Sequence, residues 1–237
     1  PKSAINAWRR ELGHTALRYA VIGEDERTSL NHLEEDIENA RRQEIQLLLL
    51  SMSAFERLSV TKEEECAARE IAGDLPFELS PTCGTGPRLS KLNVSALIVD
   101  EAHNYKAVLT PQTLRARHLG GGAEAARSAD MLTKSWVLRS QGALVAGLSA
   151  TPWKNAPHDI YALSAIFAPS LLRALGAPTP EQFALNYVEF QIGERGLEAT
   201  GMHHLRELRP WIRTYMHRRT AADVGMQLPE YRPKLHL

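Results

Sequence analysis

The stretch from Ser95 to His103 limits the possible folds of this chain more than any other part of its sequence. It reads Ser-Ala-Leu-Ile-Val-Asp-Glu-Ala-His, so an apolar run stops abruptly at two carboxylates. An apolar run of this length, β-branched near its end, is typical of a strand buried on both faces of a parallel sheet. Ligands bind to such folds at the carboxyl ends of the strands. We therefore expect Asp100 and Glu101 to lie at a ligand-binding edge. A surface turn that contains Asp-Glu is the alternative.

The rest of the chain alternates between strand patterns and helix patterns. Short apolar runs predict three further strands, at 18–22, 46–50 and 143–148. Helical spacing, caps and acidic first turns predict helices at 4–12, 29–43, 61–72, 123–139, 158–167, 180–190 and 210–219. Segments rich in Gly and Pro predict loops at 76–90 and 193–201. Such alternation predicts an α/β fold with a parallel sheet flanked by helices.

Composition narrows the class of protein. The chain has 237 residues, 43% of them hydrophobic, which allows one large domain or two small ones. Its 28 basic residues balance its 28 acidic residues, so any nucleic-acid site must be a local basic patch. Cys66 and Cys83 give neither a disulfide framework nor metal-ligand spacing, which favours a reducing compartment and predicts a cytoplasmic protein. No apolar stretch is long enough to span a bilayer, so we expect no membrane association.

Two motifs resemble those of a known family. Asp100-Glu101-Ala102-His103, followed by Ser149-Ala150-Thr151 at the end of another predicted strand, resembles motifs II and III of superfamily 2 helicases and translocases. Other segments are similar to the Snf2-related branch of that superfamily: Pro1-Lys2-Ser3 with Trp8 and Glu11, Met52 to Leu58, and Leu208-Arg209-Pro210 with Arg218-Arg219, Asp223-Val224 and Leu228-Pro229. Three more segments resemble helicase regions in large DNA-methylase-like proteins of plasmids and phages: Asn104-Tyr105-Lys106, Leu109-Thr110-Pro111 and Ser128 to Met131.

The resemblance implies a fold and an activity. It implies a RecA-like lobe of the P-loop NTPase type, here an incomplete first motor lobe at 1–168 with a helical extension at 169–227. Residues 228–237 would be a linker toward a missing second lobe. The intact parent would be an ATP-dependent DNA translocase or helicase that uses ATP and Mg²⁺. Snf2-like motors usually move along double-stranded DNA without separating the strands, which favours a translocase.

The resemblance also assigns roles to the residues of the two motifs. Asp100 would bind Mg²⁺ through water, and Glu101 would position or deprotonate the water that attacks the γ-phosphate. His103 would link the nucleotide site to motif III, because imidazole can donate and accept at once. The hydroxyls of Ser149 and Thr151 would bond to the acidic motif and transmit the nucleotide state. The plainer alternatives are solvated carboxylates, a structural histidine and a cap of the turn before Pro152.

Contacts to nucleic acid are expected at three places. Lys2 and Ser3 near the first helix, and Lys154 and Asn155 after motif III, could bind phosphate, although solvated surface residues explain them equally well. Arg213 belongs to a basic row near helical spacing that could follow a nucleic-acid backbone. The alternative there is an amphipathic helix with Trp211 and Tyr215 packed inward.

One motif of the family is missing. No Gly-x-x-x-x-Gly-Lys-Ser/Thr sequence occurs in these residues, so the phosphate-binding loop and its lysine are absent from them. The chain also begins without Met, which suggests a fragment of a longer polypeptide. We therefore expect this chain alone to bind ATP poorly and to hydrolyse it negligibly. Two other classes remain open: a nucleic-acid-binding module that never hydrolyses ATP, and a metal-dependent hydrolase that uses Asp100, Glu101 and His103.

Overall fold

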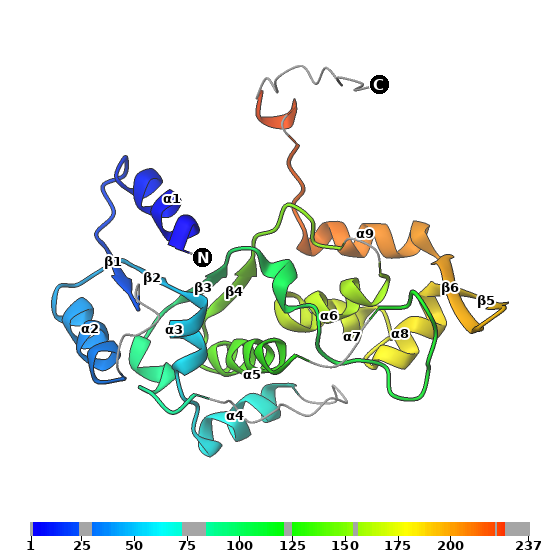
Figure 1. Cartoon of the computed structure of the whole chain (residues 1–237), viewed down its shortest axis with the longest axis horizontal. Helices are drawn as coiled ribbons and strands as arrows, with labels where there is room; N and C mark the ends of the chain where they lie inside the picture. The colour runs from blue at the N-terminus through cyan, green and yellow to red at the C-terminus, as the bar shows by residue number, and fades with distance from the viewer. Residues whose placement is uncertain are drawn as a thin grey trace, which may run out of the picture.

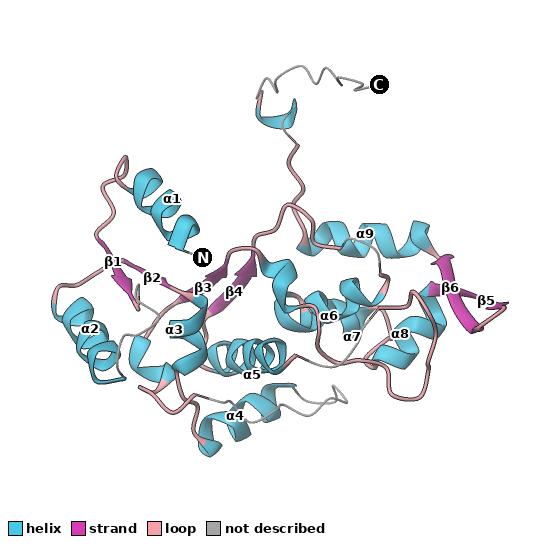
Figure 2. Ribbon diagram, in the orientation of Figure 1, coloured by secondary structure: helices cyan, strands magenta, loops and turns pink. Residues whose placement is uncertain are grey.

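The computed structural model describes residues 2–23, 30–72, 84–120, 125–153, 156–220 and 222–225. The α-helices of this part are α1 (Lys2–Leu12), α2 (Leu30–Arg42), α3 (Met52–Arg57), α4 (Lys62–Ala72), α5 (Ala126–Ser140), α6 (His158–Phe167), α7 (Pro169–Ala174), α8 (Pro180–Tyr187) and α9 (Leu205–Tyr215). The strands are β1 (Tyr19–Ile22), β2 (Leu47–Leu50), β3 (Ala96–Val99), β4 (Leu144–Gly147), β5 (Val188–Gly193) and β6 (Gly196–Met202). Short 3-10 helices are η1 (Leu89–Leu92), η2 (Ala102–Tyr105) and η3 (Ala222–Val224). Figures 1 and 2 show their arrangement.

The described residues form a mixed α/β fold with parallel strand pairs, as the alternating pattern predicted. Strand β1 pairs in parallel with β2, and α2 connects the two strands. Strand β3 pairs in parallel with β4 through a register that sets Ala96 opposite Leu144. The two pairs remain separate two-stranded sheets, and β5 and β6 form a third, antiparallel one. The described part of the chain therefore contains no extended parallel sheet. It also contains no helix long and apolar enough to cross a membrane.

The prediction that the strand before Asp100 is buried on both faces is wrong. Val99 is buried and Leu97 is partly buried, whereas Ile98 is 57% exposed. Opposite Ala96, which is also exposed, Leu144 is 65% exposed. Because side chains alternate along a strand, only one face of the β3–β4 pair packs against helices in the described part of the chain. The apolar run correctly predicted a strand. It did not show that the described helices cover only the face of the strand that carries Leu97 and Val99.

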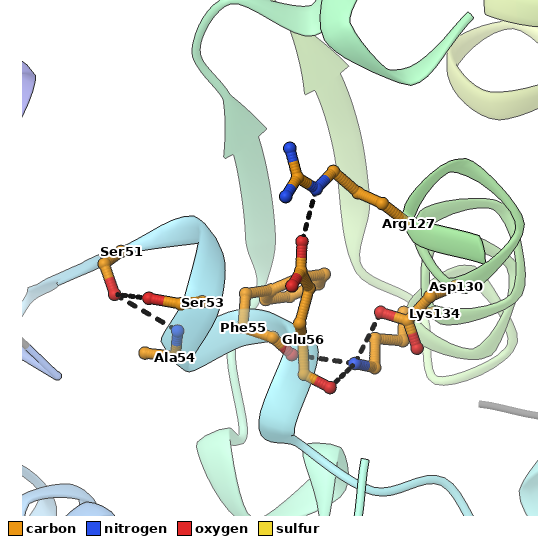
Figure 3. Close-up of polar contacts among 8 residues, drawn as sticks. All are labelled: Ser51, Ser53, Ala54, Phe55, Glu56, Arg127, Asp130 and Lys134. Atoms are coloured by element: carbon orange, nitrogen blue, oxygen red, sulfur yellow. Dashed lines mark hydrogen bonds and ion pairs between the residues drawn. The ribbon is translucent and has the colours of Figure 1, made fainter. Parts of the chain in front are cut away.

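Helix α5 forms the centre of the core. Every residue from 128 to 138 is buried, and the helix packs against α4, α6 and β4. Within it, Lys134 is fully buried, and its ammonium group donates to Asp130 Oδ2 at 2.7 Å. The same ammonium donates to the backbone oxygens of Phe55 at 2.7 Å and Glu56 at 3.1 Å (Figure 3). This cluster fixes α3, which follows β2, onto the central helix.

Most element predictions agree with the structure, and most of the disagreements fall in the last third of the chain. The predicted helix at 180–190 ends at Tyr187, and the predicted loop at 193–201 is wrong because it belongs to the β5–β6 hairpin. The last helix begins at Leu205, so Pro210 lies inside it and not in its first turn. Helices α3 and α7 were not predicted. The linker at 228–237 and residues 76–83 of the expected loop lie outside the described residues.

Candidate functional site

The carboxyl ends of β3 and β4 bring the two motifs together. Beyond the strand pairing, Leu148 N–H donates to the Val99 oxygen at 2.8 Å, and Ala102 N–H donates to the Leu148 oxygen at 2.8 Å. Gly147 ends β4 at this point. A Cβ atom there would lie 2.8 Å from Ala102 Cβ and 3.1 Å from the Phe167 ring. Glycine therefore lets the acidic segment lie directly against the end of β4.

Glu101 turns the chain sharply after the strand. Its φ of 52° and ψ of 45° are left-handed, a conformation that residues with a Cβ rarely adopt. The turn is held by Asn104, whose backbone N–H and side-chain Nδ2 both donate to the Glu101 oxygen at 3.0 Å. Burial of Tyr105, the last residue of η2, raises the pKa of its hydroxyl to about 12 and anchors the other end of the turn. Both carboxylates thus follow the strand on a rigid, strained turn.

Asp100 is exposed and accepts two hydrogen bonds. Its Oδ1 accepts from the Glu101 N–H at 2.9 Å, and its Oδ2 accepts from the Trp8 indole N–H of α1 at 2.9 Å. A carboxylate has about four acceptor positions, so acceptor capacity remains on both oxygens. Mg²⁺ binds to proteins through one or two carboxylates and keeps several waters. Asp100 therefore fits an ion held through water.

His103 joins the acidic segment to the segment after β4. Its Nδ1 lies 3.0 Å from Ser149 Oγ and 3.2 Å from Glu101 Oε2. Because an ionised carboxylate can only accept, this contact favours a proton on Nδ1. Ser149 Oγ in turn accepts from the Thr151 N–H at 3.1 Å. The structure thus places Glu101, His103 and Ser149 in one connected cluster, which Thr151 joins through its backbone N–H and not through the expected hydroxyl bond.

The three residues of the metal-hydrolase alternative do not converge on one point. The Asp100 carboxylate contacts Trp8, whereas the Glu101 carboxylate contacts His103, which in turn contacts Ser149. In the described ranges, no group of three His, Cys, Asp or Glu side chains is placed to hold a metal ion. A ligand set for a tightly bound transition metal is thus not formed by these three side chains.

The structure describes the side chain of only one of the five residues expected to contact nucleic acid. Lys2 and Ser3 begin α1, but their side chains lie outside the description, as do Lys154 and Asn155 entirely. Arg213 is exposed on α9. The inward packing considered for the two aromatic residues of α9 is wrong. Trp211 is 43% exposed and Tyr215 42% exposed, because the buried side of the helix is set by Leu208.

Two contacts at this edge were not predicted from the sequence. Trp8 was noted only for its resemblance to another motif, and 92 positions separate it from Asp100, so no local pattern could pair them. Asn104, three residues after Glu101, has the spacing of a side chain that closes a tight turn. That signal was available in the sequence.

No family model, no curated protein and no solved structure matches the chain. The functional interpretation therefore depends on the motif resemblance and on the geometry of the β3–β4 edge.

Proposed function

We propose that this chain is part of the first motor lobe of an ATP-dependent DNA translocase, with a RecA-like arrangement around the β3–β4 edge. The observation that carries the proposal is the contact of His103 Nδ1 with both Ser149 Oγ and Glu101 Oε2. This contact connects the acidic motif at Asp100 to His103 with the motif at Ser149 to Thr151. In such motors these two motifs couple hydrolysis to movement, and here they lie at the carboxyl ends of two adjacent parallel strands. Double-stranded DNA is the proposed track.

Each residue of the edge has a distinct part in this proposal. Asp100 would hold Mg²⁺ through water, using the acceptor positions that remain on its carboxylate. The chemistry that the ion would supply there is neutralisation of charge on the phosphate oxygens. Glu101 Oε2 lies beside His103, so Oε1 is the oxygen that accepts the proton of the attacking water. His103 and Ser149 transmit a change at Glu101 to the segment that follows β4.

The first test measures DNA-stimulated ATP hydrolysis after Glu101→Gln. It uses a polypeptide that contains these residues together with a phosphate-binding loop, because these 237 residues include none. The substitution keeps the size of the side chain and removes the base, so we expect kcat to fall by about 100-fold or more. Glu70→Gln, on the exposed side of α4, is the matched control and should leave kcat unchanged. Equal rates in the two variants would exclude Glu101 from the chemistry.

The same assay on this chain alone separates the motor from other possibilities. Phosphoryl transfer depends on positioning and charge stabilisation, so without a phosphate-binding loop we expect negligible turnover. Robust hydrolysis by the 237 residues, abolished by Glu101→Gln, would show that they contain a complete site. A loop-containing polypeptide that binds ATP but never hydrolyses it would favour the binding module.

A further inference from the structure

A cleft lined by three arginines lies between the segment at 110–120 and the β5–β6 hairpin. Arg115 and Arg117 come from the segment, and Arg195 comes from the turn of the hairpin. The cavity has a volume of about 400 Å³, and its remaining lining includes Thr110, Pro111 and Gly196. It is separate from the β3–β4 edge, and neither motif of the proposed motor contributes to it.

Alternation of side chains builds one wall of the cleft. Leu114, Ala116 and Leu119 pack into a small apolar cluster with Val188 and Ala199 of the hairpin. The arginines between them, at 115 and 117, are exposed. Residues two apart in an extended segment point to the same side, so the two guanidinium groups share one face.

Backbone pairing holds this wall against the hairpin. Arg117 N–H donates to the Leu197 oxygen at 2.9 Å, and Ala199 N–H donates to the Arg117 oxygen at 2.8 Å. Arg117 is thereby bridged in parallel to Glu198 of β6. The cleft is therefore a fixed feature of the fold, positioned by main-chain hydrogen bonds as well as by apolar packing.

The charges of the cleft are only partly compensated. Arg117 Nη1 donates to Glu198 Oε1 at 2.7 Å. Within the described ranges, no carboxylate pairs with Arg115 or Arg195, and both side chains are exposed. Guanidinium groups bind phosphate oxygens through paired N–H donors. The guanidinium groups of Arg115 and Arg195 therefore have no counter-ion in the described residues, and that of Arg117 is held by Glu198. This arrangement matches an anionic ligand with more than one phosphate.

We propose that this cleft binds the phosphate backbone of double-stranded DNA, with Arg115 and Arg195 as the contact residues. The inference extends the proposed function, since a DNA motor needs contacts to its track, but it requires no nucleotide chemistry. The arginines are exposed at a surface cleft, which suits a strand passing across it better than an enclosed small anion. Glu198 limits the affinity by neutralising Arg117.

The test is binding of a fluorescein-labelled duplex of mixed sequence to the full chain, measured by anisotropy without ATP over a range of salt concentrations. The double variant Arg115→Ala/Arg195→Ala should raise Kd about tenfold and reduce the slope of log Kd against log salt by about 2. The control, Arg41→Ala/Arg42→Ala, removes the same charge from the exposed end of α2, at the opposite end of the molecule (Figure 1). It should change Kd less than about twofold.

A variant that is expected to strengthen DNA binding distinguishes lost contacts from damage to the fold. Glu198→Gln removes the carboxylate beside Arg117, so it should tighten DNA binding by about two- to fivefold. Equal losses in the two double variants, weaker binding by Glu198→Gln, or no binding by the unaltered chain would overturn the inference. So would displacement of the duplex by low millimolar inorganic phosphate at constant ionic strength, which would indicate a small-anion site. Because ATP is absent, none of these results depends on the Glu101→Gln experiment.

Discussion

Lys134 is a buried charged residue, so its ammonium group depends on protein atoms, and not on water, for its hydrogen bonds. Its ammonium group is fully buried and is bound by the Asp130 carboxylate and by the backbone oxygens of Phe55 and Glu56. It also lies 5.1 Å from the centre of the Phe55 ring. The cost of burying this charge is offset only while all of these contacts are present. The residue therefore fixes how α3 sits on α5.

We predict that Lys134→Met lowers the free energy of unfolding by about 3–5 kcal/mol, because it leaves a buried carboxylate without its cation. Denaturation by urea, followed by circular dichroism, measures the change. Arg42→Met is the matched control, since Arg42 and Glu38 form an exposed pair with the same four-residue spacing. Its effect should be below about 0.5 kcal/mol. Similar effects of the two substitutions would show that Lys134 is not the anchor described.

His158 makes stability depend on pH. Burial lowers the pKa of its imidazole, outweighing the Val108 carbonyl and the carboxylates of Asp159 and Glu181, which act in the opposite direction. Its Nε2 lies 3.0 Å from the Val108 oxygen, so Nε2 carries the proton and the neutral ring is the native form. The unfolded chain then binds more protons than the folded one as the pH falls below about 6.5.

We therefore predict that the urea midpoint falls as the pH decreases from about 7.5 to about 5.5, the range in which an unfolded histidine becomes charged. In His158→Gln the midpoint should be lower at neutral pH but depend less on pH. His14→Gln changes an exposed histidine and should leave the pH dependence as it is. An unaltered slope in His158→Gln would assign the effect to another group.

At the scale of single residues, the sequence predicted the cluster at the β3–β4 edge but not the contact that completes it. Glu101, His103 and Ser149 follow predicted strands directly, so adjacent parallel strands bring them together. The Trp8 contact with Asp100 depends on where α1 comes to rest, which the fold determines and no spacing encodes. The charge of Lys134 likewise gave no sign of burial, because two of its hydrogen-bond partners are backbone oxygens of the distant helix α3, and a third, Asp130, has the spacing of an ordinary exposed ion pair.

At the scale of elements, regular apolar spacing predicted helices and strands correctly, whereas glycines within the β5–β6 hairpin led to the prediction of a loop. Val188 to Ile192 alternates apolar and polar residues, which is a strand signal, but Gly193, Gly196 and Gly201 made the region resemble a loop. The two residues between Gly193 and Gly196 instead form the tight turn of a hairpin. Pro210 was expected in a first turn. Helix α9 instead begins at Leu205, because burial of Leu208 stabilises the turn before Pro210 although proline has no N–H to donate.

The end of β4 gives a prediction at this scale. Gly147→Val would drive side-chain atoms into Ala102 and Phe167, so it should destabilise the protein by about 1–3 kcal/mol and displace the acidic turn. Ala146→Val, on the neighbouring position that faces the open side of the sheet, is the control and should cost less than about 0.5 kcal/mol. Thermal unfolding of the two variants makes the comparison. Equal stability would contradict the close approach of η2 to β4.

At the scale of the whole molecule, the two proposed sites are far apart. The acidic edge lies at the ends of β3 and β4, near α1, whereas the arginine cleft lies at the β5–β6 end (Figures 1 and 2). Whether separate strand pairs join into one sheet depends on contacts between distant segments. Local patterns predicted the strands but could not predict this arrangement. The separation also means that each site can be altered without touching the other.

Displacement of a triplex-forming strand from duplex DNA tests the central claim most directly, because it detects movement along the duplex without requiring strand separation. With a loop-containing polypeptide that includes these residues, we predict ATP-dependent displacement, its loss in Glu101→Gln, and no unwinding of plain duplex. Failure to displace the third strand with ATP, or equal displacement by Glu101→Gln, would contradict the assignment of a DNA translocase to the β3–β4 edge.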